Sequence, residues 1–128
     1  MPEKGYQIYA ELYDCDSKLS RADDVRDIFV EGIISSGMTI VQEAFQQFEP
    51  HGVTITLILS ESHAVIHTWP EHNHVSIDIF TCVKGGQEKA VKAIEILKES
   101  FKAREAEIQM NRRGFLYDEE LNKNIVSE

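Results

Sequence analysis

The side chains that could carry out chemistry gather in one stretch of this chain, from Ser60 to Cys82, which reads SESHAVIHTWPEHNHVSIDIFTC. Ser62 is a candidate nucleophile, and Cys82 ends the stretch with a thiol available for chemistry. Four histidines stand between these two residues: His63, His67, His72 and His74. A hydroxyl, several imidazoles and a thiol so close in sequence indicate either a metal site or a reactive centre.

The histidines are the argument for a metal site, because His-x-His on a strand directs both imidazoles to the same side. His72 and His74 have that spacing. However, no carboxylate or cysteine stands at a familiar ligand spacing, and Trp69-Pro70 interrupts the run. We therefore expect no metal at this stretch.

A Ser-His hydrolase built on Ser62 is less favoured still, because the Gly-x-Ser-x-Gly elbow is missing and no third triad member is evident. The plainest interpretation is structural. In that interpretation Ser62 and Thr68 cap strand ends, Trp69 packs, and Cys82 is a buried small hydrophobe. Each residue taken singly favours this interpretation.

Composition limits the class of protein. A chain of 128 residues that is 42% hydrophobic and 27% charged is expected to form one globular domain, residues 1–128. A formal charge of −9 argues against a nucleic-acid partner, and no apolar run is long enough to cross a membrane. With no secretory signal pattern at the N-terminus, the prediction is a cytoplasmic location, where Cys15 and Cys82 would be free thiols.

Alternation of apolar and polar residues predicts most of the strands that must position these side chains. The predicted strands cover residues 5–14, 38–48, 53–59, 63–69, 75–82 and 106–110. The central strands follow one another through short links, which favours an antiparallel sheet.

Two helices complete the prediction. Ser20 to Asp23 resembles a capping box, and apolar residues then recur at helical spacing from Arg21 to Ser36. A second apolar helical face follows Gly85-Gly86, formed by Ala90, Ile94, Leu97 and Phe101. The fold class predicted is α+β, a two-layer α/β sandwich whose mainly antiparallel sheet is covered by two helices.

Strand parity separates a reactive face from an apolar face in the central strands. In residues 74–82, the reactive side carries His74, Ser76, Asp78, Phe80 and Cys82. The other side carries Val75, Ile77 and Ile79. Strict parity also puts Ser62 on the side opposite His67. These two residues can therefore meet only if the chain bends or breaks near Ser62.

Three segments together resemble the prokaryotic S-adenosylmethionine decarboxylase proenzyme family. They are Glu61-Ser62-His63, the sequence IHTWPE from Ile66 to Glu71, and the sequence DIFTC from Asp78 to Cys82. Weaker similarity covers residues 10–16 and 48–53, so the resemblance extends in order over roughly residues 5–85. The remaining predicted helix and strand fit the family's α/β sandwich, which forms dimers.

The resemblance implies self-processing, because the family's serine attacks the preceding carbonyl and β-elimination then splits the chain. Here the cut would fall between Glu61 and Ser62, giving a β chain of residues 1–61 and an α chain that begins with a pyruvoyl group made from Ser62. That ketone would form a Schiff base with the substrate amine, with no external cofactor. The implied function is decarboxylation of S-adenosylmethionine for spermidine, and thus polyamine, synthesis by a homodimer of cleaved protomers.

Residue roles are carried over from the family by position. His67 matches the histidine linked to processing, and Cys82 matches the cysteine thought to protonate the substrate carbon. Glu61 and Glu71 become candidates for hydrogen bonding to adenine and ribose. Phe48 is a candidate for stacking on adenine or facing the sulfonium, although core packing is an equally good interpretation of this aromatic residue.

The chain also departs from the family pattern around the expected pocket. Thr54 stands where the family usually has a serine that supports processing, so a hydroxyl is kept on a stiffer side chain. Further departures are Ile55, His72, His74 and Val83. They leave two alternatives open: a pyruvoyl-dependent decarboxylase of arginine or ornithine, and a non-processing paralogue that acts as a regulatory subunit.

Overall fold

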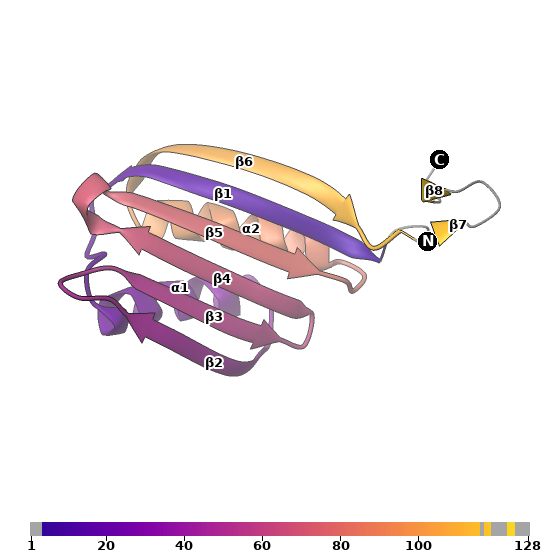
Figure 1. Cartoon of the computed structure of the whole chain (residues 1–128), viewed down its shortest axis with the longest axis horizontal. Coiled ribbons are helices and arrows are strands. Elements are labelled where there is room, and N and C mark those ends of the chain that lie inside the picture. The colour runs from indigo at the N-terminus through magenta and orange to yellow at the C-terminus, as the bar shows by residue number, and fades with distance from the viewer. Residues whose placement is uncertain (1–3, 116, 119–122, 125–128) are drawn as a thin grey trace.

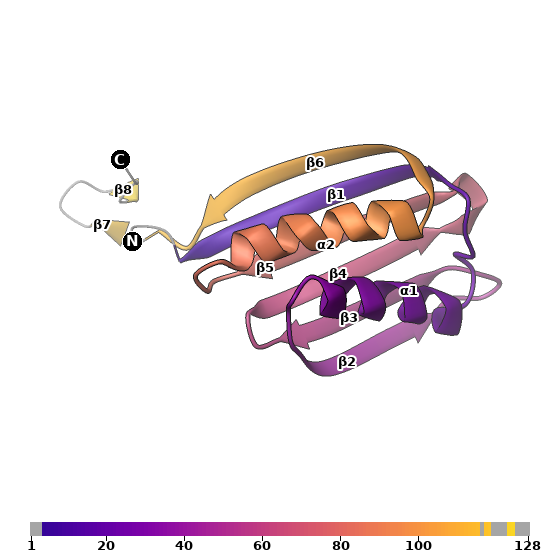
Figure 2. The ribbon, with the colours of Figure 1, turned by 180° about the vertical axis from the view of Figure 1, so that it is seen from behind.

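Alternating apolar residues build a six-stranded antiparallel sheet with two helices on one of its faces (Figures 1 and 2). The computed structural model describes residues 4–115, 117–118 and 123–124. The sheet contains β1 (Gly5–Cys15), β2 (Ile40–Gln47), β3 (Val53–Leu59), β4 (Ser62–Trp69), β5 (His74–Thr81) and β6 (Ala103–Arg113). The helices are α1 (Ala22–Ser35) and α2 (Gly86–Ser100), and a 3-10 turn, η1 (Pro70–His72), joins β4 to β5. Two further short strands, β7 (Tyr117–Asp118) and β8 (Lys123–Asn124), pair with each other.

The strand order is β2-β3-β4-β5-β1-β6, and every neighbouring pair is antiparallel. β2 to β5 form a meander through short links, as predicted. β1 inserts between β5 and β6, so the first and last long strands lie side by side. The predicted α+β sandwich of an antiparallel sheet and two helices is confirmed.

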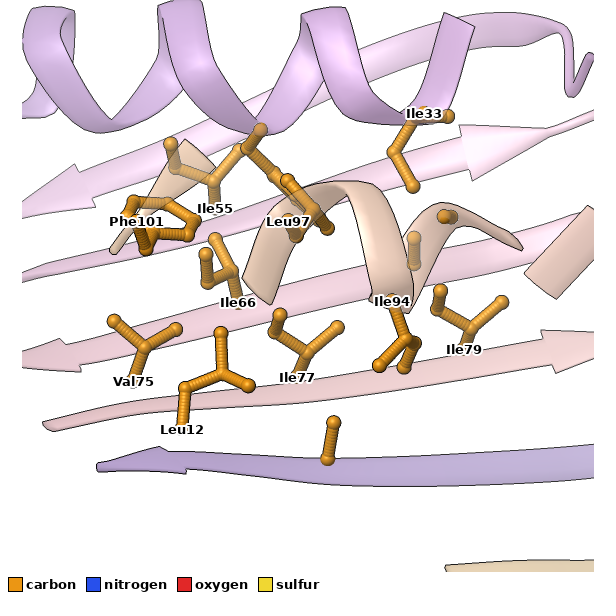
Figure 3. Packing of buried hydrophobic residues seen from close by; sticks show 14 of the residues in the cluster. Leu12, Ile33, Ile55, Ile66, Val75, Ile77, Ile79, Ile94, Leu97 and Phe101 are labelled. Carbon is orange, nitrogen blue, oxygen red and sulfur yellow. The ribbon is translucent and has the colours of Figure 1, made fainter. Parts of the chain in front are cut away.

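One face of the sheet carries the core. Every second residue of β4, from Ala64 onward, and of β5 is buried. In β4 the apolar ones are Ala64 and Ile66, and in β5 they are Val75, Ile77 and Ile79. These side chains pack against the helix residues Val25, Phe29, Ile33, Ala90, Ala93, Ile94, Leu97 and Phe101. Figure 3 shows several of these residues meeting between the sheet and the helices.

The start of α1 differs from the prediction. No side chain in the segment from Ser20 to Asp23 caps the helix, so the capping-box prediction is wrong. Instead the side-chain oxygen of Gln47, at the end of β2, accepts a hydrogen bond from the Ala22 N–H at 2.6 Å. The Gln47 amide nitrogen donates in turn to the Ser20 carbonyl at 2.9 Å. The first free N–H of α1 therefore finds its hydrogen-bond acceptor on β2 and not within its own segment.

The opposite face of the sheet has no helix over it (Figure 1). It displays the second parity set of the central strands, including His63, Val65, His67 and Trp69 from β4 and His74, Ser76, Asp78 and Phe80 from β5. We call this the open face. The parity predicted from sequence is confirmed here for the residues within β4 and β5, and it leaves His63, His67 and His74 on the uncovered side.

Candidate active site

The turn that carries the Glu61-Ser62 peptide bond joins β3 to β4. Ser60 donates a backbone hydrogen bond to the Thr39 carbonyl at 3.0 Å, which ties the turn to the start of β2. Ser62 has a φ of 150°, a value that side-chain-bearing residues rarely adopt. Backbone conformations of this kind cost free energy and concentrate at functional sites. The backbone therefore departs from regular strand geometry at Ser62, but this departure does not bring Ser62 to His67.

Cys82 contacts both sides of that peptide bond from the end of β5. Its backbone N–H donates to the Glu61 carbonyl oxygen at 3.1 Å, and its Sγ lies 3.5 Å from the same oxygen. The Ser62 Oγ lies 3.4 Å from the Cys82 Sγ. One residue thus places a backbone donor and a thiol at the Glu61 carbonyl, an arrangement that can stabilise negative charge on that oxygen.

The Glu61 carboxylate points away from the open face. Its side chain is buried, with 7% of the residue exposed. One oxygen accepts the Thr39 N–H at 3.1 Å and the Ser60 hydroxyl at 3.3 Å, and the other lies 3.8 Å from the Lys89 Nζ of α2. These partners belong to the chain itself and differ from the adenine or ribose predicted from sequence.

A second group of predicted residues gathers farther along β4. Thr54 Oγ1 lies 2.9 Å from the Nδ1 of His67, so the hydroxyl predicted to support processing contacts the predicted processing histidine. Both residues line a cavity of about 310 Å³ together with Phe48 and Glu71. Phe48 is 49% exposed, which makes it available to a ligand and not a core residue.

The two groups do not meet within one chain. Ser62 and His67 are five residues apart on β4, which corresponds to about 16 Å along a strand. Ser62 and Cys82 lie where β4 begins and β5 ends, at the right of the sheet in Figure 1. His67 lies toward the opposite end, on the open face. The sequence identified both groups but could not show that they are separated.

The remaining histidines of the stretch do not converge on a metal. His74 Nε2 lies 2.7 Å from a carboxylate oxygen of Glu11 on β1, and Ser76 donates to the other oxygen at 2.9 Å. His72 lies on η1. Among the residues that the structure describes, no three His, Cys, Asp or Glu side chains form a possible metal set.

The two cysteines have opposite environments. Cys82 is exposed and contacts the Ser62 hydroxyl. Cys15 is buried, and this burial, together with the nearby charge of Asp14, raises the pKa of its thiol from 9.0 to about 11. Cys82 is therefore the thiol that can take part in chemistry, whereas Cys15 belongs to the core.

Several residues of this site were not predicted from the sequence. Thr39 and Lys89 contact Glu61, and Glu11 contacts His74 and Ser76, yet each lies far from its partner in the chain. No local motif contains them. Only the pairing of the strands and the packing of α2 bring them to the site.

Comparison with known proteins gives a consistent result. The family model described as S-adenosylmethionine decarboxylase matches residues 6–114. The chain is 38% identical over 111 residues to an S-adenosylmethionine decarboxylase proenzyme from Persephonella marina, covering 86% of this chain and 82% of that one. It is 39% identical over 120 residues to the proenzyme of the same name from Fervidobacterium nodosum, covering 93% and 85%.

A solved structure agrees with these relatives. The crystal structure of the adenosylmethionine decarboxylase from Aquifex aeolicus is similar to this fold with a TM-score of 0.82 and 31% sequence identity. The match covers 93% of this chain and 98% of that chain. In addition, no helix in the part of the chain that the structure describes is long and apolar enough to cross a membrane.

Proposed function

Because the chain belongs to the S-adenosylmethionine decarboxylase family, we propose that it cuts itself at Ser62 and decarboxylates S-adenosylmethionine with the resulting pyruvoyl group. One observation supports this proposal most strongly. The Glu61 carbonyl accepts the Cys82 N–H at 3.1 Å, while the hydroxyl of the strained Ser62 lies 3.4 Å from the Cys82 thiol. Nucleophile, scissile carbonyl and charge-stabilising donor are thus assembled at one peptide bond.

Self-cleavage begins with attack of the Ser62 Oγ on the carbonyl carbon of Glu61. The C–N bond breaks, the amide becomes an ester, and the nitrogen of Ser62 becomes a free amine. The Cys82 N–H is positioned to stabilise the negative charge that develops on the Glu61 oxygen during this attack. A strained backbone at Ser62 favours the rearrangement, since strain in the reactant is released when the amide bond breaks.

β-Elimination then opens the ester. A base removes the proton from the Cα of Ser62, and Glu61 leaves as a carboxylate that ends the β chain. Hydrolysis of the remaining enamine, through its imine form, releases ammonia and leaves a ketone at residue 62. His67 is the base in this proposal because imidazole is the side chain that most often acts as a general base.

The residues present fit a pyruvoyl group at position 62. Such a group supplies an electron sink for decarboxylation of a substrate that carries an amine. Cys82 already contacts the side chain of residue 62 and is exposed, so its thiol can deliver a proton to the substrate carbon after carbon dioxide has left. The same residue would then serve processing through its N–H and catalysis through its thiol.

Two protomers are needed to complete this site. His67 and its strand partner Thr54 lie about 16 Å along β4 from Ser62, too far for proton transfer within one chain, and Phe48 and Glu71 line the same cavity as these two residues. In a two-fold dimer with the open faces packed together, the first end of β4 in one protomer can face the second end in its partner. We therefore propose a homodimer in which each Ser62 receives the His67 of the other chain.

The open face has the composition of such an interface. Trp69 and Tyr13 contact the His74 ring at centroid distances of 5.4 and 4.9 Å. Farther along, the Arg113 guanidinium lies 4.5 Å from the Phe80 ring centroid. Aromatic and arginine side chains are enriched where proteins associate. A second copy would remove these rings from water.

The second group of residues supports the substrate assignment. An exposed aromatic side chain at Phe48 can stack on adenine or attract the sulfonium cation. The Glu71 carboxylate, 3.6 Å from the Nδ1 of His51, lies on the rim of the same cavity and can accept hydrogen bonds from ribose hydroxyls. Decarboxylation would yield the aminopropyl donor for spermidine synthesis, and a cytoplasmic location belongs to the same proposal.

Intact-mass measurement tests the proposal. Purified wild-type protein should separate into a β chain of residues 1–61 and an α chain with a pyruvoyl terminus, whereas Ser62→Ala should remain a single 14.6 kDa species. Carbon dioxide release should occur with S-adenosylmethionine and not with arginine or ornithine. Borohydride added with substrate should trap a covalent adduct on the α chain.

Each alternative has its own result in this experiment. Release from arginine or ornithine would assign another substrate to the same pyruvoyl chemistry. A wild-type chain that stays uncut and traps no substrate would identify a non-processing regulatory subunit and refute the proposed enzyme.

A further inference from the structure

The Glu61 carboxylate joins three segments that are distant in sequence. Thr39 lies between α1 and β2, Ser60 lies in the β3–β4 turn, and Lys89 lies on α2. All three contact this one side chain, at 3.1, 3.3 and 3.8 Å respectively. A carboxylate that is 7% exposed needs such partners, because an unpaired buried charge is costly. The Glu61 side chain is thus held in place by contacts within the protein.

The backbone carbonyl of Glu61 is held by Cys82. The Glu61 carbonyl receives the Cys82 N–H at 3.1 Å and lies 3.5 Å from its Sγ. With the carboxylate and the carbonyl both fixed, the orientation of the Glu61-Ser62 peptide plane is also restrained. Attack by a neighbouring hydroxyl depends steeply on such orientation.

We infer that Glu61 is a positioning residue for both self-cleavage and decarboxylation, and that Lys89 is the cation that holds its carboxylate in place. Before the cut, this ion pair aligns the Glu61 carbonyl with Ser62 and Cys82. The inference rests on the proposed function, since it assigns a task to two residues around the proposed cut.

After the cut, the contact has a second consequence. Glu61 becomes the end of the β chain, and chain ends fray unless side chains or hydrogen bonds hold them. Its new terminal carboxylate would keep the Cys82 N–H as a donor, while Lys89 and Thr39 hold the side chain. Cys82 therefore stays in place for its proton transfer only while the end of the β chain stays in place.

This assignment differs from a role in substrate binding, which the sequence suggested for Glu61. A residue that binds adenine or ribose acts on KM, because it contributes to substrate affinity. A residue that positions the reacting groups acts on the cleavage rate and on kcat. The two roles are distinguishable by experiment.

Lys89→Met is the main test, since it removes the ammonium and keeps most of the stem. Cleavage should slow about tenfold by intact mass, and the processed enzyme should show a kcat lowered about tenfold with KM within about twofold of wild type. Lys89→Arg should recover most of both rates. Lys92→Met, an exposed position on the same helix, is the matched control and should behave like wild type.

Glu61→Gln provides an independent variant, because its amide oxygen can still accept the Thr39 N–H but no longer pairs with Lys89. It should reproduce the Lys89→Met rates, and the double variant should be no slower than either single one. The melting temperature should fall for Lys89→Met, which leaves the buried Glu61 carboxylate without its cation, and should fall less for Glu61→Gln, which also removes the charge.

The outcomes separate the inference from the proposed function. If wild type cleaves and releases carbon dioxide while Lys89→Met matches it in both rates, the inference fails and the proposed function stands. A raised KM with unchanged cleavage would also overturn the inference and return Glu61 to substrate binding. Wild type that never cleaves would refute both.

Discussion

At the scale of single residues, the Thr54 hydroxyl contacts Nδ1 of His67 and can either accept a hydrogen from this nitrogen or donate one to it. Thr54 Oγ1 lies 2.9 Å from Nδ1. For Nε2 to accept a proton, the ring must carry its hydrogen on Nδ1, which the Thr54 oxygen can receive. In the proposed function, the threonine would take the part of the serine that the family usually has at this position.

Replacing Thr54 by valine tests this contact at nearly constant volume. Cleavage of Thr54→Val should be about tenfold slower than wild type, the effect of one hydrogen bond on a reacting group. Thr54→Ser should stay within about threefold. Thr56→Val is the matched control, because Thr56 lies two residues along the same strand and face. Equal rates for Thr54→Val and wild type, measured by intact mass, would remove Thr54 from the processing machinery.

The two thiols give a second prediction at this scale, because the proposed cleavage would put Cys15 on the β chain and Cys82 on the α chain. At pH 8, iodoacetamide should add one group to the α chain and none to the β chain, with loss of carbon dioxide release. Burial raises the Cys15 pKa to about 11, so its reactive thiolate is roughly one part in a thousand at that pH.

The pH dependence of Cys15 has a defined sign. A folded-state pKa above the ordinary 9.0 means that the fold favours the protonated thiol. This contribution to stability is present below about pH 9 and is lost as the pH rises toward 11. Alkylation of the β chain at pH 8 in folded protein, at a rate like that of the α chain, would contradict the burial of Cys15.

At the scale of elements, the side chain of Gln47 links the edge strand β2 to the start of α1. It accepts the Ala22 N–H at 2.6 Å, and its amide donates to the carbonyls of Ser20 and Gly52 at 2.9 and 3.0 Å. Gln47→Ala should lower the free energy of unfolding by about 1–3 kcal/mol, since it removes a helix cap and leaves backbone groups unpaired.

Thermal unfolding measures this effect, and Gln46→Ala is the control. Gln46 is exposed, and its side-chain amide donates a hydrogen bond to the carbonyl of the adjacent residue, Gln47. Its loss should change the melting temperature little. A Gln47→Ala protein as stable as the control would show that α1 begins without this cap.

The same element shows what sequence patterns can and cannot predict. The parity of β4 and β5 follows from alternation, because burial on one side dictates every second residue, and the start of β3 follows from the turn residues that precede Val53. The capping-box prediction was wrong because the Ala22 N–H is bonded by the side chain of Gln47, which lies 25 residues away in the sequence but close in space. Local patterns predict which face is buried, whereas partners across the sheet decide where an element starts.

The candidate site shows the same difference between what local sequence patterns predict and what only the fold reveals. Ser62, His67 and Cys82 were found through a resemblance in order along the chain, which says nothing about distance in space. Strand geometry then puts about 16 Å between Ser62 and His67. The sequence also gave no signal for Lys89 or Thr39, because their contacts with Glu61 depend on how α2 and β2 pack. Residue identity was predictable, whereas the grouping of residues needed the fold.

At the scale of the whole molecule, the uncovered sheet face and the divided site have one common explanation. Two copies packed through their open faces would bury the rings of Phe80 and Trp69 and bring the His67 of each chain toward the Ser62 of the other. One dimer would then contain two equivalent sites, each built from both chains. Neither chain alone could cut itself.

Mixing two inactive variants tests this sharing directly. His67→Ala and Ser62→Ala should each remain uncut alone, since one lacks the base and the other the nucleophile. When the two are co-expressed, about half of the His67→Ala chains should be cut, because random pairing gives each an even chance of a partner with His67. Mass spectrometry distinguishes the two variants and their products.

A control mixture isolates the contribution of the partner. Co-expression of His67→Ala with the Ser62→Ala/His67→Ala double variant should give no cleavage, because neither chain then carries the imidazole. If the first mixture also stays uncut, His67 does not act across the interface. If His67→Ala cuts itself when alone, this imidazole is not the base at all. Cleavage in the first mixture alone requires that a chain with Ser62 be completed by the His67 of another.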